Sequence, residues 1–353
     1  MVTRGWRLGR RPGLDGIRAV AVVLVVVAHA QATFGGRLTI AGSVGVAMFF
    51  ALSGFLISSI LLEGEGFVPF YRNRALRLFP AIVVFVLVAG AVQQARTGAS
   101  MVRLWPAASY LANWLPMPSS MTHLWSLAVE QQFYMVWPVA LALVARWRNG
   151  PLVLCLGGMA GSLVLKLVLW DGGAGAARLY GGSDTQAWAI LSGCLLAVLA
   201  HRGLVSVAVP WLGVAVVAVS AVAVTVPGGP MSNALVVPLV LPLLTALFVW
   251  AACGARDPLL ASPLLRYLGR RSYALYLWHP FAFGLAVAGA GHDLPALVLG
   301  IVLTLVLAEL SWHLVEAPFL RLRARRTTVV PVSAPAVPVA AVLPRLQVQS
   351  GAA

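Results

Sequence analysis

Charged residues are scarce in this chain of 353 residues, because Asp, Glu, Lys and Arg together make up only 10% of it. A soluble globular domain carries about 25% charged residues, so the composition excludes an ordinary soluble fold. Hydrophobic residues account for 60% of the chain, and its mean hydropathy is +0.91. We therefore expect a multi-pass protein of a bacterial-type cell membrane, with the lipid bilayer as its first partner.

Cysteine, lysine and acidic residues are also rare. The 3 cysteines fall in apolar segments without metal-ligand spacing, so we expect neither a metal site nor a disulfide framework. Lys166 is the single lysine, and 10 acidic residues stand against 25 basic ones, which gives a net charge of +15. Most arginines lie in short loops between apolar segments, so the charge indicates membrane orientation and contact with anionic lipid, and we expect no nucleic-acid partner.

Hydropathy predicts an all-α bundle of about ten transmembrane helices. Their approximate limits are residues 14–34, 42–62, 76–95, 123–145, 151–170, 185–201, 208–226, 235–252, 272–290 and 295–316. Eighteen arginines fall in the termini and alternate loops, against four in the opposite loops, so the positive-inside rule places both termini in the cytoplasm. Residues 104–116 are rich in aromatic residues and proline, and we expect them to lie at the membrane interface.

These spans divide the chain into three parts. We expect a basic cytoplasmic N-terminus at 1–13, a membrane domain at 14–318, and a cytoplasmic tail at 319–353 that is first basic and then rich in Pro, Val and Ala. Prolines break helices and strands, so the tail is expected to be disordered, and Glu316-Ala317-Pro318 is interpreted as the end of the last helix. We expect no appended soluble catalytic domain, which assigns any chemistry to the membrane domain.

Arg18 and His29 lie in one apolar run, from Leu14 to Ala30, where a charged or titratable group is costly. Eleven residues separate them, so on a helix they project from nearly the same face, about 16 Å apart along the axis. This placement makes both candidate catalytic residues. The alternatives are an Arg18 that reaches back to the interface and a His29 that is buried and hydrogen-bonded for structural reasons.

A second group occurs in THLWSLAVEQQFYMVWP, where His123, Ser126 and Glu130 are spaced to share one helical face. A carboxylate inside a span needs a partner or a water-filled cavity, so Glu130 is a further catalytic candidate, and His123 and Ser126 are candidates for substrate binding. The alternative is a hydrogen-bond network that docks neighbouring helices.

Arginines cluster at the cytoplasmic start of the third span, in YRNRALRLFPA, which contains Arg72, Arg74 and Arg77. Arg74 and Arg77 share a face, three residues apart. Arginine is the preferred ligand for phosphate, so the cluster predicts a site for a phosphate-bearing donor. Positive-inside anchoring is the alternative.

Two single residues complete the candidate substrate site. Asp184 begins the sixth span, where an acid at a helix N-terminus is also explained by capping. His279 lies in RRSYALYLWHPF, where it is either a buried neutral imidazole or a substrate contact.

Together these segments resemble the acyltransferase 3 family of integral-membrane acyltransferases. The resemblance rests on LDGIRAVAVVLVVVAHA, GVAMFFALSGFLIS, RNRALRLFPA, HLWSLAVEQQFYMVWP, DTQAWAILSGCLLA and SYALYLWHPF, in the family's order, from Leu14 to about Pro318. It implies that Arg18 and His29 are the family's arginine–histidine pair and that Arg74 and Arg77 are its Arg-x-x-Arg element. The chain departs from the family at Gln186, where an arginine is frequent, and this puts a charge-paired role for Asp184 in doubt.

The resemblance implies a membrane O-acyltransferase that uses a coenzyme A thioester, acetyl-CoA by default, as donor substrate, with no permanently bound cofactor. The acceptor is expected to be a carbohydrate, a glycolipid or a hydroxylated secondary metabolite. We expect His29 to act as general base or as a transient acyl carrier, with Glu130 or another buried polar group orienting it. The alternatives are a transporter or flippase of a lipid-linked or acylated glycan, and a non-catalytic scaffold. The sequence leaves the oligomeric state open.

Overall fold

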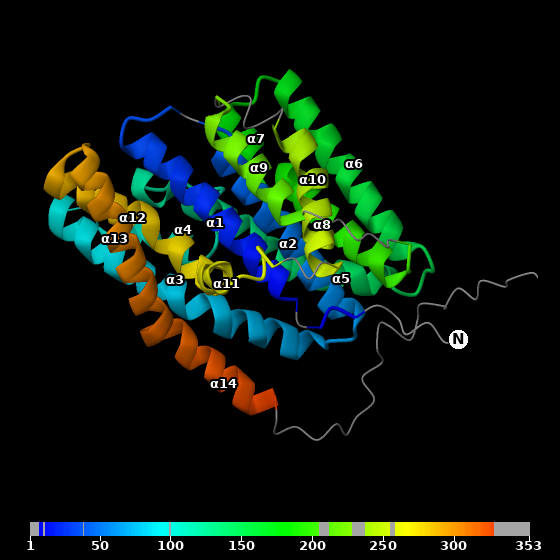
Figure 1. Ribbon diagram of the computed structural model, residues 1–353. Helices are drawn as coiled ribbons and strands as arrows, with labels where there is room; N and C mark the ends of the chain where they lie inside the picture. Colours follow the sequence, from blue (N-terminus) through cyan, green and yellow to red (C-terminus); the bar gives the residue numbers. More distant parts are fainter. Residues whose placement is uncertain are drawn as a thin grey trace, which may run out of the picture.

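The computed structural model describes residues 7–9, 11–37, 39–98, 100–204, 212–227, 237–254 and 258–327, and this part of the chain is helical without any β-strand. The α-helices are α1 (Pro12–Thr33), α2 (Ala41–Leu62), α3 (Phe67–Thr97), α4 (Trp105–Ala108), α5 (Trp125–Val144), α6 (Gly150–Asp171), α7 (Ala176–Gly181), α8 (Ser183–His201), α9 (Leu212–Thr225), α10 (Val237–Gly254), α11 (Pro263–Arg270), α12 (Ser272–Ala290), α13 (Leu294–Ser311) and α14 (Ala317–Thr327). Short 3-10 helices at Met101–Leu104 and Ser119–Leu124 precede α4 and α5. Figure 1 shows one bundle, with α6 at one flank and α13 at the other.

The predicted all-α membrane bundle is confirmed. Within the described residues, 7 helical segments are long and apolar enough to cross a bilayer. The other three predicted spans coincide with α9, α10 and α12, which are not among these seven segments, and the described part of α10 contributes an apolar stretch at Leu241–Trp250. The exact count of ten and the cytoplasmic termini stay predictions. The segment 104–116 contains only single turns of helix and cannot span.

Helix α2 lies at the centre of the bundle and is buried along most of its length. It crosses α8 at two glycines that replace side chains at the contact. A Cβ atom at Gly54 would lie 2.0 Å from the carbonyl oxygen of Ile190, and one at Gly193 would lie 1.9 Å from that of Ala51. The small residues of the second span thus allow close backbone packing, and this packing holds Ser53 of α2 in a fixed place.

The C-terminal end of the bundle differs from the sequence interpretation. Glu316-Ala317-Pro318 does not terminate a helix, because a π-helical turn at Trp312–Glu316 connects α13 to α14, and the chain stays helical to Thr327. Pro318 lies in the first turn of α14, where a missing N–H is tolerated. The predicted tail therefore begins inside α14, and residues 328–353 lie outside the described residues.

Candidate active site

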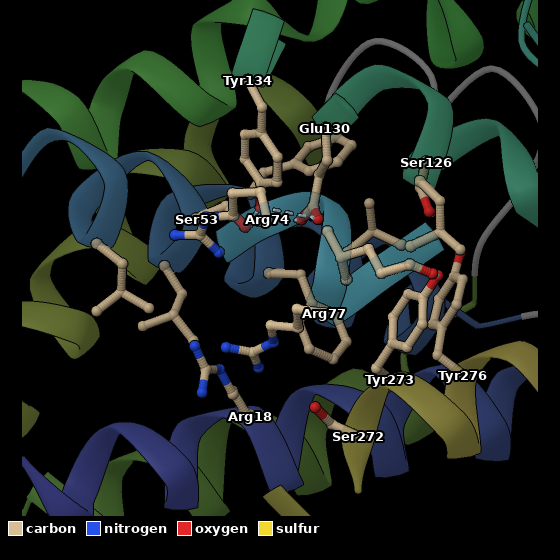
Figure 2. A pocket seen from close by; sticks show the side chains of 17 residues that line it. Arg18, Ser53, Arg74, Arg77, Ser126, Glu130, Tyr134, Ser272, Tyr273 and Tyr276 are labelled. Carbon is tan, nitrogen blue, oxygen red and sulfur yellow. Dashed lines mark hydrogen bonds between the residues drawn. The ribbon is translucent and has the colours of Figure 1, made fainter. Parts of the chain in front are cut away.

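A cavity of about 80 Å³, here called the arginine pocket, lies between α1, α2, α3, α5 and α12. Its polar lining consists of Arg18, Ser53, Arg74, Arg77, Ser126, Glu130, Tyr134, Ser272, Tyr273 and Tyr276. Figure 2 shows the guanidinium groups of Arg18, Arg74 and Arg77 directed into the same space. A cavity of this size holds a few water molecules, so it fits a narrow part of a substrate rather than a nucleotide.

The same three arginines line an adjoining cavity of about 160 Å³ that includes Glu65, Phe70 and Asn73, near the loop between α2 and α3. That loop lies on the predicted cytoplasmic side. The arginines therefore stand between an approach from this side and the arginine pocket. The sequence prediction that Arg74 and Arg77 share a face is confirmed, whereas Arg72 lines neither cavity.

The guanidinium charges in the pocket are only weakly matched by carboxylates. Arg18 lies 3.5 Å from Asp15 of its own helix. Within the described part of the chain, neither Arg74 nor Arg77 has a carboxylate oxygen within ion-pair distance, and Arg74 instead stacks 5.1 Å above the ring of Tyr134. Such an arrangement leaves the pocket with positive charge available for an anion.

Glu130 belongs to a three-residue hydrogen-bond network in this pocket. Ser53 donates to Glu130 Oε1 at 2.9 Å, Tyr134 donates to Oε2 at 3.2 Å, and the hydroxyls of Ser53 and Tyr134 are 2.8 Å apart. Ser53 comes from α2 and the other two from α5, so the network also docks these helices. His29 takes no part in it, because its Nδ1 donates to the carbonyl of Val25 at 2.9 Å. The proposal that Glu130 orients His29 therefore has no hydrogen bond behind it.

Three histidines from three separate segments form a second group, here called the histidine cluster. The ring centroids of His29 and His279 are 4.8 Å apart, and those of His123 and His279 are 5.6 Å apart. His123 Nε2 donates to the carbonyl of Leu277 at 3.3 Å. His29 is half-buried, while His123 and His279 are buried. No group of His, Cys, Asp and Glu among the described residues is arranged to hold a metal ion.

Tyr276 connects the arginine pocket to the histidine cluster. Its hydroxyl lines the pocket, and its ring centroid lies 5.7 Å from those of both His123 and His279. Because His279 follows Tyr276 by three residues on α12, the cluster lies about 4.5 Å further along that helix. Arg18 and Glu130 thus share one pocket, whereas His29 lies in the adjoining cluster. Of the candidate substrate residues, Ser126 lines the pocket and His123 and His279 join His29.

Asp184 is located apart from both groups, and it is charge-paired. Because Gln186 replaces an arginine that is frequent in the family, the sequence put a charged partner for Asp184 in doubt. The structure corrects this: Arg178 of α7 binds both carboxylate oxygens of Asp184, at 2.8 and 2.6 Å. Gln186 is buried and donates to the carbonyl of Tyr180 instead. The guanidinium of Arg178 also stacks 5.1 Å above Trp114, so the pair ties α7 and α8 to the segment before α5.

Sequence reasoning missed three residues of this region: Ser53, Tyr134 and Tyr276. Tyr134 follows Glu130 by four residues and Tyr276 precedes His279 by three, so helical spacing alone places each beside its partner. Ser53 carries no comparable signal, because its contact with Glu130 depends on how α2 crosses α5.

Comparisons with known proteins found a matching family and several similar relatives. The profile of a family described as an acyltransferase domain matches residues 11–313. A Bacillus subtilis protein named "Putative peptidoglycan O-acetyltransferase" is 33% identical over 356 residues, which cover 87% of this chain and 54% of the relative. The peptidoglycan O-acetyltransferase of Listeria monocytogenes is 28% identical over 353 residues, which cover 87% and 55%. The chain spans about half the length of these curated relatives. No solved structure matches it.

Proposed function

The chain belongs to the acyltransferase 3 family, and from this premise we propose that it transfers an acyl group, acetyl by default, from a coenzyme A thioester to a hydroxyl of a cell-envelope carbohydrate. Its relatives are named for peptidoglycan O-acetylation, which favours a peptidoglycan or a related envelope glycan as the acceptor.

The observation that carries the proposal is the convergence of Arg18, Arg74 and Arg77 on one pocket with few carboxylate partners. Arginine binds phosphate groups through paired N–H donors, and a donor nucleotide on the predicted cytoplasmic side offers several phosphates. The pocket is too small for the nucleotide itself, so we infer that the slender thioester arm enters it while the phosphates stay in the adjoining cavity.

His29 is the proposed general base. A carbonyl oxygen only accepts hydrogen bonds, so the bond to Val25 fixes the proton on Nδ1 and leaves Nε2 with a free lone pair. In the reaction, Nε2 removes the proton of the acceptor hydroxyl, whose oxygen attacks the thioester carbonyl. The C–S bond then breaks, the thiolate leaves with the electron pair, and the proton passes to the sulfur. In a variant of this scheme the acyl group rests briefly on His29.

The remaining candidates receive supporting roles. Glu130 is proposed to balance the arginine charge and to hold Ser53 and Tyr134 along the path of the thioester arm. Ser126 and His123, which lie on either side of Tyr276, are proposed to contact the acceptor, whereas His279, which is fully buried, is proposed to act through His29. Asp184 is proposed to support the acceptor side through Arg178.

The proposal is tested with purified protein in proteoliposomes, supplied with acetyl-CoA on one side and glycan fragments on the other. We expect ester formation on the glycan, detected by mass spectrometry, and its loss in His29→Ala. Uptake of the glycan or its lipid-linked form without any ester would contradict acyl transfer and support a transporter. Ester formation from another thioester but not from acetyl-CoA would support acyl transfer and contradict acetyl-CoA as the donor.

A further inference from the structure

Pro280 determines how the preceding histidine is held. A proline inside a helix has no N–H, so the carbonyl four residues earlier loses its helical partner. In α12 that carbonyl belongs to Tyr276, and His279 Nδ1 donates to it at 2.8 Å. A second contact, to the carbonyl of Leu275 at 3.1 Å, strengthens the arrangement. The His279-Pro280 pair therefore places the proton on Nδ1 and leaves Nε2 as a lone-pair acceptor.

The free nitrogen of His279 is buried and has no hydrogen-bond partner. The side chain is 0% exposed, and Nε2 is among the buried polar atoms that lack a partner. Leaving such an atom unpaired costs stability, so its lone pair is available to a donor that comes within reach. The nearest ring is that of His29, which likewise uses Nδ1 for its own helix and keeps Nε2 free.

We propose that His279 is a positioning residue that shares the proton which His29 removes from the acceptor hydroxyl. The inference rests on the proposed function. In the resting state each ring holds its proton on Nδ1, and the two ring centroids are 4.8 Å apart in an edge-to-face arrangement. When the O–H bond of the acceptor breaks and its proton reaches His29 Nε2, the new N–H donates to His279 Nε2. The imidazolium is thereby held by a charge-assisted hydrogen bond until the proton passes to the departing thiolate.

The surroundings of His279 favour this role over a second independent base. The titratable side chains that face its ring are His29 from α1, His123 from the segment before α5, and Tyr276 from its own helix. The remaining ring neighbour is Phe283, at 6.0 Å. Among the described residues, no carboxylate forms a hydrogen bond or ion pair with either His29 or His279, which favours the neighbouring imidazole as the partner of a charge on His29.

Two substitutions of His279 separate positioning from packing. In His279→Asn, the side-chain amide can still donate to the Tyr276 carbonyl, as Nδ1 does, but no hydrogen-bond acceptor lies at the position of Nε2. In His279→Gln, the longer side chain extends its amide toward that position. We expect His279→Asn to lower kcat by about 10- to 100-fold with both KM values within about twofold of wild type. His279→Gln should recover part of this loss because its amide oxygen is an acceptor.

The matched control is His201→Asn, since His201 Nδ1 donates to its own helix at Ala197 and lies outside the histidine cluster. Its kcat should equal that of wild type. Wild-type kcat in His279→Asn would overturn the inference and leave the proposed function intact. Equal losses of activity and thermal stability in the Asn and Gln variants would show a packing role and also overturn it. If the wild-type protein forms no ester, the proposed function fails, and this inference fails with it.

Discussion

The hydroxyl oxygens of Ser126 and Tyr276 lie 2.5 Å apart, at the place where the arginine pocket ends and the histidine cluster begins. Tyr276 also donates to the main-chain carbonyl of His123 at 2.8 Å, so the proton of the shorter bond comes from Ser126. This pair joins α12 to the start of α5. Because Tyr276 lies between the arginine pocket and the histidine cluster, it is the first residue to test in the proposed transfer.

Tyr276→Phe should lower both thermal stability and turnover. The substitution removes the 2.8 Å donor of the His123 carbonyl and the acceptor of the short Ser126 bond, and an unpaired buried group costs about 1–3 kcal/mol. Ser126→Ala removes the short bond and a longer one of 3.5 Å to the same carbonyl, and it should cost less because the Tyr276 bond to that carbonyl remains. Because the two residues share a bond, the double variant should be less destabilised than the sum of the single changes, as measured by thermal unfolding in detergent. Strict additivity would show that the bond has no energetic role.

The arginine pocket predicts that substitutions of two neighbouring arginines, Arg77 and Arg72, differ in their effect on the donor KM. Arg77→Ala should raise the donor KM, because losing a charge-assisted contact costs about 1.5–3 kcal/mol, or roughly 10- to 150-fold. Arg77→Lys should rescue it only partly, since an ammonium lacks the paired N–H donors. Arg72→Ala is the matched control and should leave the donor KM unchanged, because Arg72 lies outside the pocket. An unchanged donor KM in abundant Arg77→Ala protein would reduce the cluster to a topology signal.

Helical spacing alone accounts for much of this region. It placed Arg74 with Arg77 and Ser126 with Glu130, because residues three or four apart on one helix share a face. It could not pair Ser53 with Glu130 or His29 with His279. Those contacts depend on how separate helices cross, and spacing along one helix does not reveal which residues of another helix it meets.

Two interpretations of short sequence segments are wrong, because each depends on structure that the segment itself does not contain. Pro318 was interpreted as a helix stop, yet the π-helical turn before it shifts the hydrogen-bond register and places the proline in the first turn of α14. Gln186 suggested that Asp184 lacks a charged partner, yet Arg178 supplies one from six residues upstream. In each case the relevant residue is visible in the sequence, but the backbone conformation that brings it to its partner or places it in a helix is not.

The Arg178–Asp184 pair predicts a stability effect on the acceptor side. Both side chains are about one-third exposed, so breaking the pair with Arg178→Ala should cost about 1 kcal/mol. Arg178→Lys should lose the two-point contact and rescue little. We expect thermal unfolding to shift more than kcat in these variants. A large loss of kcat with unchanged unfolding would instead place Asp184 in direct contact with substrate.

The positive-inside rule predicts on which side of the membrane each loop lies. Reporter fusions near residues 66, 148 and 325 should report the cytoplasm, and fusions near 98 and 229 the outside. The fusion near 229 is the most informative, because it follows α9, which is shorter than a typical span. A cytoplasmic signal there would remove the α9–α10 pair from the count of crossings and contradict the prediction of ten.

His29 gives the sharpest prediction. His29→Ala should abolish acyl transfer while the protein stays inserted and folded, since Ala28 and Ala30 flank a position where the helix accepts a small side chain. Losing a general base lowers the rate by about 10²–10⁴-fold, and losing an acyl carrier lowers it further. His29→Gln keeps a hydrogen-bonding group but no proton transfer, so it should fail as well.

The decisive assay for His29 compares membrane abundance, thermal unfolding and ester formation in both variants, with His201→Ala as the matched control. If the imidazole served only packing, His29→Gln would retain most activity, and His29→Ala would lose protein rather than turnover. Abundant, stable His29→Ala protein with near-normal ester formation would refute its role as base and as acyl carrier alike. Inactive but stable variants, beside an active control, would locate the chemistry at the half-buried end of the histidine cluster.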